Sequence, residues 1–276
     1  MSTIIIPNRW TRQPTGMVEV DWNHPITRDL TFFCSPFSGI ICDIAKNRTI
    51  VPNGVNSTVI NAMSGKAINF NGSQNNLEVS FGDVTDIDGI RAITVDFDTH
   101  INSNTNAKPF NKWDNGNAFL VQYSAGNILW VVDNGAGTRS RRDTTDTPIV
   151  ANIRNHVSCS FKDSGTVSND GKIYVNGKLS AMTNVSNACT GIGNVAAALQ
   201  FGRSQGAPSS ITGNMQFARI WKRSLDISEV VSLYENPWQI CKPLVKRIYV
   251  SPAAAAGGFQ AAWATRKSKI IGAGVN

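Results

Sequence analysis

The chain is poor in charge, in long apolar runs and in cysteine motifs. Charged residues make up 16% of its 276 residues, against roughly 25% in an average domain. No 18-residue apolar run occurs, and the first ten residues, MSTIIIPNRW, lack the basic start and apolar core of a secretory signal. We therefore expect neither a membrane span nor a signal peptide, and synthesis in the cytoplasm. The five cysteines form no CxxC pair, which favours buried free thiols over a zinc site or a complete disulfide framework.

Residue patterns that would indicate catalysis are also scarce. The three histidines, His24, His100 and His156, lie far apart and form no HExxH motif. Carboxylates alternate at two places, Glu19 with Asp21 and Asp96 with Asp98, which is the spacing that glycanases use to point two acids into one cleft. Neither pair has the further Glu partner of that pattern, so the sequence predicts no catalytic residue and no enzyme.

The net charge of +7 is concentrated at one end of the chain. Residues 1–236 contain 20 Lys and Arg against 19 Asp and Glu, a balance of +1, whereas residues 237–276 contain six basic residues and no acid. This asymmetry predicts a tail that meets an acidic partner surface, with a solvated basic tail as the alternative. It disfavours a core that binds nucleic acid, and no contact with a membrane is expected.

Short strand-like runs fill the middle of the sequence. Residues 1–29 show no periodicity, contain Pro7, Pro14 and Pro25 with Trp10 and Trp22 between them, and are interpreted as an extended arm. From Leu30 onward, apolar runs separated by Gly, Asn, Asp and Ser clusters predict strands at LTFFC, KAINF, LEVSF, AITVDFDTHI, AFLVQYS, NILWVVD, HVSCSF, KIYVNGKLS, ALQFG and MQFARIW. Many short strands at this spacing indicate an all-β sandwich or barrel.

Local signals identify a hairpin, a helix and a C-terminal segment. Asn176-Gly177 is the pair best suited to a type I′ turn. Asp226 and Glu229 form a capping box for a helix that Pro237 ends. LVKRIYV predicts a further strand, which an Ala- and Gly-rich linker follows. The basic, aromatic segment after the linker is expected to dock on a partner. The candidate docking residues are Phe259, Trp263, Arg266, Lys267 and Lys269 in this segment, and Trp10 and Trp22 in the N-terminal arm.

The order of these segments resembles the laminin-G-like, concanavalin A-like jelly-roll domains of bacteria and their phages, over roughly residues 28–240. The resemblance is carried, in the family's order, by RDLTFF, GKAINFNGS, AITVDF, NHVSCSF, IYVNGK, LQFGR and the closing stretch from Gly213 to Tyr234. The Asn236-Pro237-Trp238 extension is especially similar to phage versions. The resemblance implies two antiparallel sheets packed face to face, one short helix and three regions: an arm over 1–29, the jelly roll over 30–250 and a docking segment over 251–276.

In phage proteins such domains decorate the head or form tail modules, and arms anchor them to the particle. The resemblance therefore implies a non-enzymatic virion accessory protein whose partners are capsid or tail proteins. The alternative is a soluble carbohydrate-binding module that recognises a cell-surface glycan. Arms that associate with one another also make a homo-oligomer a reasonable expectation.

Candidate glycan-binding residues follow from chemistry. The stretch from Asp133 to Asp146, interpreted as a loop, carries Arg139, Arg141 and Arg142, which could bind an anionic glycan or phosphate unless Asp133, Asp143 and Asp146 neutralise them. Trp113 and Tyr123 are candidates for stacking on sugars, whereas Trp130 is expected in the core. No cofactor or resident metal is predicted. Calcium is the one metal that the hard oxygen ligands would suit, at Asn71, Gln74, Asn75, Asn76, Asp83, Asp86 and Asp88.

Overall fold

The structure is a computed structural model of the whole chain. It describes residues 12–50, 58–62, 65–72, 79–103, 106–114, 117–135, 138–163, 171–187, 189–202 and 211–244, which all fall within one compact unit, Met1–Leu244. Among these residues no helix has the length and apolar character needed to cross a bilayer.

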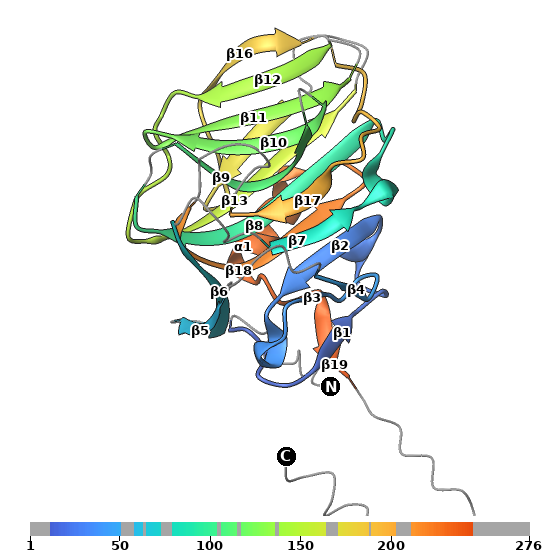
Figure 1. Cartoon of the computed structure of the whole chain (residues 1–276), viewed down its shortest axis with the longest axis vertical. Coiled ribbons are helices and arrows are strands. Elements are labelled where there is room, and N and C mark those ends of the chain that lie inside the picture. The colour runs from blue at the N-terminus through green and yellow to red at the C-terminus, as the bar shows by residue number, and fades with distance from the viewer. Residues whose placement is uncertain are drawn as a thin grey trace, which may run out of the picture. The chain divides into compact units, whose positions relative to one another are not determined.

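One sheet of the sandwich has seven antiparallel strands (Figure 1). Their spatial order is β16 (Met182–Asn187), β12 (Arg139–Thr144), β11 (Asn127–Asn134), β10 (Asn117–Ser124), β9 (Ala107–Asp114), β17 (Ala198–Phe201) and β7 (Val79–Asp83). Four of these strands, β9 to β12, follow one another along the chain as a meander, so the middle of the sheet is formed by a single stretch of sequence.

The second sheet has ten strands and is built around β18 (Thr212–Trp221). Its main order is β15 (Lys178–Leu179), β14 (Gly171–Val175), β13 (Arg154–Lys162), β8 (Ala92–Ile101), β18, β2 (Leu30–Ser35), β3 (Cys42–Asp43) and β4 (Arg48–Thr49). The first half of β18 pairs instead with β6 (Gly65–Asn71), which in turn pairs with β5 (Thr58–Ala62). The predicted antiparallel two-sheet sandwich is confirmed.

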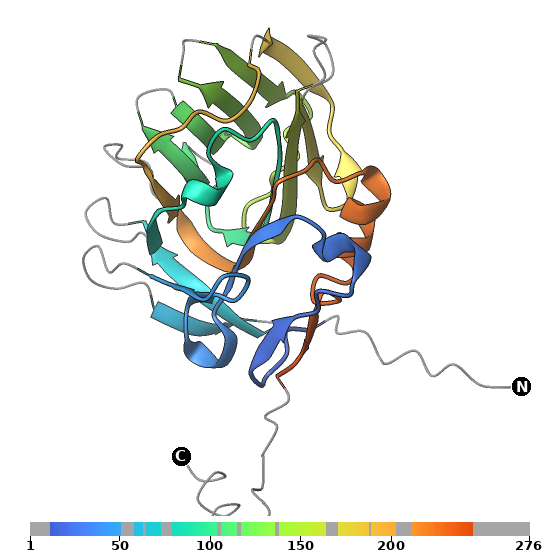
Figure 2. The same ribbon diagram turned by 90° about the vertical axis from the view of Figure 1, so that its right-hand side faces the viewer.

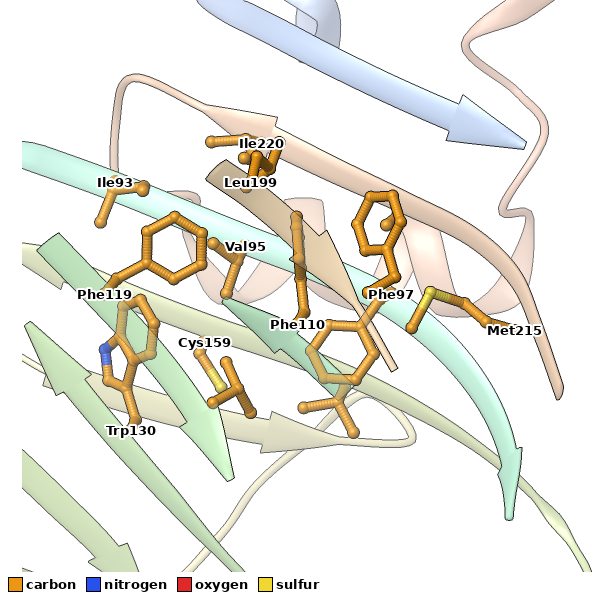
Figure 3. Packing of buried hydrophobic residues seen from close by; sticks show 14 of the residues in the cluster. Ile93, Val95, Phe97, Phe110, Phe119, Trp130, Cys159, Leu199, Met215 and Ile220 are labelled. Carbon is orange, nitrogen blue, oxygen red and sulfur yellow. The ribbon is translucent and has the colours of Figure 1, made fainter. Parts of the chain in front are cut away.

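The main core lies between the two sheets. Alternate residues of β8, namely Ile93, Val95 and Phe97, meet aromatic side chains of the facing sheet, Phe110, Phe119 and Trp130, and all six are buried (Figure 3). The rings of Phe97 and Phe110 lie 5.9 Å apart in an edge-to-face arrangement, and those of Phe110 and Phe119 lie 5.6 Å apart. Trp130 belongs to this core as expected, and its indole nitrogen donates to the carbonyl of Ser160 at 3.1 Å.

A second apolar cluster lies on the other face of the ten-stranded sheet. Figure 2 shows the orange helix from the C-terminal part of the described chain beside that sheet. The cluster joins outward-facing residues of that sheet, such as Phe33, Phe217 and Trp221, to the helix α1 (Ile227–Glu235) and to Trp238. The rings of Phe217 and Trp238 are 5.3 Å apart, edge to face. The central strands β2 and β18 are therefore buried on both faces, which explains why apolar residues in them are adjacent, as in Phe32-Phe33 and Ile220-Trp221, rather than strictly alternating.

Helix α1 begins as predicted. The Asp226 carboxylate accepts from the backbone N–H of Glu229 at 2.9 Å, and the Glu229 side chain accepts from the N–H of Asp226 at 3.0 Å. Val230 and Leu233 are buried on the sheet. The predicted hairpin is also present, because β14 and β15 pair across a turn in which Asn176 and Gly177 both have positive φ, 50° and 75°.

The prediction of an extended N-terminal arm over 1–29 is wrong for residues 18–29. Strand β1 (Val18–Val20) pairs with β19 (Cys241–Pro243), and Val18, Val20 and Ile26 are buried in the second cluster. Burial of these aliphatic side chains, at roughly 1.5–3 kcal/mol each, outweighs the weak local preference of the segment. The clasp, our name for the β1–β19 pair, thus joins the two ends of the described chain.

The cysteines are free, as the sequence suggested. Four are buried, and Cys42 is half-buried. Burial raises the pKa of Cys34 and Cys159 well above the ordinary thiol range and raises that of Cys241 to about 12. Thiols held in this state are poor nucleophiles, so these three cysteines are packing residues.

Candidate ligand-binding surface

The outer face of the seven-stranded sheet is formed by residues that alternate with the core residues. One row of register partners crosses this face: Asn111, Leu120, Val131 and Arg141. The adjacent row points into the sandwich: Phe110, Val121, Trp130 and Arg142. The alternation follows from the two-residue repeat of a strand.

Only part of the outer face is accessible. Ser80, Gln200 and Asn111 lie opposite one another on β7, β17 and β9, and they are 3%, 3% and 0% exposed. The side chains of Trp113, Arg141 and Asp143 are partly exposed, and 45% of the Arg139 side chain is accessible. The open region therefore lies over β12 and the end of β9.

Trp113, Asp133 and Arg139 form a contact set at this open end. Trp113 lies opposite Ala118, Ala118 opposite Asp133, and Asp133 opposite Arg139, so the set spans four strands in one row. The small side chain of Ala118 leaves room between the larger ones. The Arg139 guanidinium carbon lies 5.4 Å from the centre of the Trp113 ring, within the range of a cation–π contact.

Asp133 fixes the position of Arg139. The carboxylate is buried, accepts from the Arg139 Nε at 3.0 Å through Oδ2 and accepts from the backbone N–H of Gly135 at 2.8 Å through Oδ1. The result is a half-buried indole face beside a guanidinium group whose outer nitrogens remain near solvent.

Arg141 and Asp143 form a second pair on the same face. Arg141 donates to both carboxylate oxygens of Asp143, from Nε at 2.8 Å and from an Nη nitrogen at 2.6 Å. The side chains are two residues apart on one strand and so point to the same side. Hydrogen bonding to Asp143 raises the pKa of the Arg141 guanidinium. Such two-point pairs are the strongest of the surface ion pairs.

The structure brings three of the five predicted glycan-binding residues together: Trp113, Arg139 and Arg141. The stretch predicted as a loop is instead mostly strand, in β11 and β12. Because strand residues alternate in direction, Arg142 points inward, where it is 3% exposed and donates to Asn184 Oδ1 at 2.5 Å and to the carbonyl of Ser186 at 3.1 Å. Its prediction as a ligand-binding residue is wrong.

Tyr123 is also wrong as a sugar-stacking residue. It is fully buried, and its hydroxyl lies 3.0 Å from the hydroxyl of Thr99 in the core. Burial raises the pKa of Tyr123 well above its ordinary value. No ligand in solvent can reach this ring in the folded protein.

Of the predicted docking residues, only Trp22 lies within the described part of the chain. Its side chain is 52% exposed, in the turn that follows the clasp. The remaining ones fall outside the described residues: Trp10, Phe259, Trp263, Arg266, Lys267 and Lys269.

A buried charged cluster lies on the other face of the molecule, beneath α1. Asp96 contacts Arg219 at 2.6 Å, His156 at 2.8 Å and the hydroxyl of Ser158 at 2.6 Å. Burial alone would raise the pKa of Asp96, but Arg219 and then His156 outweigh it and hold that pKa well below its ordinary value. Although it combines Ser, His and Asp, the cluster is 0–1% exposed and the serine bonds to the aspartate rather than to the histidine. It is a structural cluster.

The carboxylates considered for calcium are engaged by basic side chains. The Lys112 ammonium lies 2.8 Å from Asp83 and 2.5 Å from Asp88, and Arg48 pairs with Asp86. The candidates Gln74, Asn75 and Asn76 lie outside the described residues. Within the part of the chain that the structure describes, no group of three or more His, Cys, Asp or Glu is arranged to hold a metal ion.

Comparison with known families identifies the chain's relatives. The model of the concanavalin A-like lectin/glucanases superfamily matches residues 71–231, more than half of the chain. The chain belongs to this superfamily. The matched span runs from the end of β6 to the middle of α1 and so includes the whole open region of the outer face.

Solved structures of the superfamily fold share low sequence identity with the chain. The binding domain of a paraclostridial mosquitocidal protein superposes with a TM-score of 0.61 at 18% identity, over 76% of this chain and 52% of that one. Domain 4 of an extracellular arabinanase from Geobacillus stearothermophilus, in complex with arabinotriose, gives 0.58 at 18% identity, over 75% and 98%. The receptor-binding domain of botulinum neurotoxin D gives 0.59 at 14% identity, over 77% and 54%.

These comparisons bear on the fold. The chain spans about half the length of the two toxin domains and nearly all of the arabinanase domain. Each of these three structures is named as a binding domain or is bound to a sugar, so the fold resembles binding domains rather than catalytic ones. No curated protein sequence gives a significant match.

The sequence prediction missed Asp133 as the residue that positions Arg139. A signal was present, because Asp133 and Arg139 flank the short Gly-containing stretch NGAGT, as cross-strand partners of a hairpin do. The hairpin was not predicted because β12, RSRRDT, has no apolar residues to mark it as a strand.

Proposed function

We propose that the protein is a non-enzymatic recognition module that binds a glycan on the open region of its seven-stranded sheet. The observation that carries this proposal is the half-buried Trp113 ring with the Arg139 guanidinium 5.4 Å from its centre. The apolar plane of an indole stacks favourably on the apolar face of a sugar ring, and the N–H donors of the guanidinium that lies over the indole suit sugar hydroxyls. Since Asp133 and the sheet hold both groups in place, little ordering is needed when a ligand binds.

The surroundings of the alternating carboxylates support a non-enzymatic role. Asp96 is enclosed by Arg219 and His156, and Asp98 is buried and paired with Arg154. Glu19 and Asp21 lie 3.5 Å and 3.9 Å from Lys242 on the clasp. A glycosidase instead needs two carboxyl groups that face each other across an open cleft.

The test is a glycan array with the full chain, followed by titration of any sugar that binds. Trp113→Ala should weaken binding roughly tenfold or more, because it removes the stacking face. Trp22→Ala is the matched control, because Trp22 is also an accessible tryptophan but follows the clasp strand β1 and does not belong to the seven-stranded sheet. Equal affinity for both variants and the parent protein would rule out Trp113 as the binding residue.

The setting that we propose for this module is a phage virion, where it acts as an accessory protein of the head or tail. Support comes from charge: the body is balanced, whereas residues 237–276 hold six basic residues and no acid, a composition suited to an acidic surface on a capsid or tail protein. The chain leaves the described domain at Leu244, next to Met17, whose carbonyl accepts from the Leu244 N–H at 3.0 Å. Exposed apolar side chains lie at this end, with Met17 58% and Trp22 52% exposed.

Particle incorporation tests the setting. A chain that ends at Leu244 should fold but be lost from assembled particles, as measured by the amount of protein that sediments with them. Trp22→Ala should lower incorporation while glycan binding is unchanged, and Trp113→Ala should do the reverse. Full occupancy by the shortened chain would refute anchoring by the C-terminal segment.

A further inference from the structure

We propose that the glycan recognised at the Trp113 surface is uncharged, an inference that rests on the proposed glycan-binding function. Three arginines in one short stretch favour an anionic ligand when only the sequence is considered. The structure favours the opposite, because none of the three presents an uncompensated positive charge to the outer face.

Arg139 is the arginine closest to the indole ring, and its charge is balanced by Asp133. The contact between Arg139 Nε and Asp133 Oδ2 is 3.0 Å, and only 3% of the Asp133 side chain is exposed. A buried carboxylate acts through a low dielectric, so its field at the Arg139 guanidinium is weakly screened. An anionic sugar group that approached Arg139 would also approach this carboxylate.

Arg141 and Arg142 also present no uncompensated positive charge to the outer face, each for a different reason. Each carboxylate oxygen of Asp143 accepts one hydrogen bond from Arg141, at 2.8 Å and 2.6 Å, so the charge of Arg141 is balanced. Arg142 faces inward and is buried. On β11 and β12 the outward-facing charged residues are therefore two arginines and two aspartates: Arg139, Arg141, Asp133 and Asp143.

A surface of this kind suits hydroxyl groups. The Nη nitrogens of Arg139 can donate to sugar oxygens, the partly exposed Asp143 can accept from them, and Trp113 offers an apolar plane. A carboxylate, sulfate or phosphate on the ligand would have to displace an existing carboxylate partner or lie beside it. Juxtaposed like charges reduce affinity, so the pairs select against acidic glycans.

The experiment uses an array on which each oligosaccharide backbone is present in neutral form and in uronate, sulfated or sialylated form. The full chain should bind neutral members, and the affinity measured by calorimetry should be nearly constant between roughly 0.01 and 1 M NaCl, although the Debye length falls from about 30 to about 3 Å. A D133N/D143N double variant keeps the size of both side chains but frees the two arginines. It should gain binding to the acidic members, at least tenfold at low salt, and lose that gain at high salt.

The outcomes are distinct. If the parent protein binds acidic members and ignores their neutral counterparts, the inference is overturned while glycan recognition stands. If no member binds in either form, the proposed function itself fails and this inference fails with it. If the double variant gains no binding to acidic members, its melting temperature shows whether it has unfolded. In that case the single variant D143N, which changes only the partly exposed pair, provides the same test with less disturbance of the fold.

Discussion

Arg219 is the residue that joins the ten-stranded sheet to the layer above it. Its guanidinium group is fully buried, pairs with Asp96 at 2.6 Å and donates to the carbonyl of Pro237 at 2.6 Å. It also lies 4.0 Å from the centre of the Phe217 ring. Burial lowers the pKa of Arg219 and the Asp96 carboxylate opposes that shift, so each charge is tolerated only because the other is present.

Replacing Asp96 by Asn should therefore strongly destabilise the protein. The change leaves Arg219 buried without its counter-charge, and we expect a loss of about 3–5 kcal/mol in the free energy of unfolding. Urea unfolding at pH 7 measures it. Glu235→Gln, at the exposed end of α1, removes a carboxylate without burying a charge and should change stability by less than about 0.5 kcal/mol.

The same pair of proteins tests the direction of the Asp96 pKa. Because that pKa lies below its ordinary value of about 3.9, the ionised group stabilises the fold fully above roughly pH 4–5, and this contribution is lost as pH falls toward the folded-state pKa. The stability gap between parent and Asp96→Asn should therefore shrink below about pH 4. Asp43, whose pKa is raised by burial, contributes with the opposite sign in both proteins and cancels in the difference. Asp98, whose pKa is also raised by burial, cancels only in part, because the Asp96 charge adds to that rise.

For single residues, the sequence predicts the chemical type of a side chain better than the face of the sheet to which that side chain points. Trp113, Tyr123 and Trp130 are all aromatic and lie near one another in the chain, yet the first is on the outer face and the other two are in the core. The difference arises from the strand register, and the register of β10 is altered by a positive φ of 67° at Ala118 and by an irregularity between Val121 and Tyr123. A single-residue uncertainty in such a register reverses every side chain, which is why Tyr123 and Arg142 were misassigned.

Among the elements, β18 does the most to connect the fold, since β8 lies along one side of it while β6 and β2 share the other. Its second residue, Gly213, has a φ of 143° and lies opposite Ile101 of β8. A Cβ atom at this position would collide with the His100 carbonyl oxygen and lie 2.8 Å from the Ile101 Cα. Both are backbone atoms in the centre of a sheet and cannot move aside cheaply.

Gly213→Ala should therefore cost considerably more than the backbone strain alone. Gly89→Ala is the matched control, because Gly89 also has a positive φ, 67°, but a Cβ there would meet nothing within 4 Å. We expect a loss of about 1 kcal/mol for the control and at least 2 kcal/mol more for Gly213→Ala, measured by denaturant unfolding. Equal losses would contradict the close approach of β18 and β8.

The strands that the sequence predicted are those with apolar runs on a core face, and the missed ones lack that signal. The ten runs from Leu30 to Trp221 all fall on strands, including β8 and β18, whereas the further strand predicted at LVKRIYV lies outside the described residues after Leu244. Strand β9 contains Pro109 and Lys112, β12 is RSRRDT and β16 is MTNVSN, so none shows an alternation. They are strands because their neighbours pair with them, an effect of tertiary context that local patterns do not contain. The candidate site lies on β9 and β12, so its residue types were predictable and its geometry was not.

At the scale of the described domain, a third layer covers the outer face of the ten-stranded sheet. It contains α1, Trp238 and residues of the chain's own N-terminal region, such as Val18 and Val20. The signal for it was present in β2 and β18, where successive residues such as Phe32 and Phe33 are both apolar and therefore require cover on both faces. The charge balance of the body predicted nothing about this layer. The family resemblance predicted the sandwich but not the place of residues 18–29.

The clasp should therefore contribute directly to global stability. A chain spanning 22–244 loses β1, which removes Val18 and Val20 from the second cluster and leaves β19 without its partner. Comparison with a chain spanning 12–244 measures this loss together with that of the buried Gln13, whose amide donates to the Ser35 hydroxyl at 2.8 Å. Two buried valines are worth roughly 3 kcal/mol or more, so the melting temperature of the shorter chain should fall by several degrees.

A point variant distinguishes packing from pairing within the clasp. Val20→Ala keeps the β1 backbone and its pairing with Cys241 but removes side-chain volume from a residue that is 1% exposed, and we expect about 1–3 kcal/mol. Glu19→Ala, at the adjacent outward-facing position beside Lys242, should cost less than about 0.5 kcal/mol because its ion pair is exposed. If the 22–244 chain melts at the same temperature as the 12–244 chain, residues 18–20 are not part of the folded core and the extended-arm interpretation is correct. If instead its melting temperature falls, and Val20→Ala but not Glu19→Ala reproduces part of that fall, then packing of the clasp helps to hold the sandwich and its third layer together.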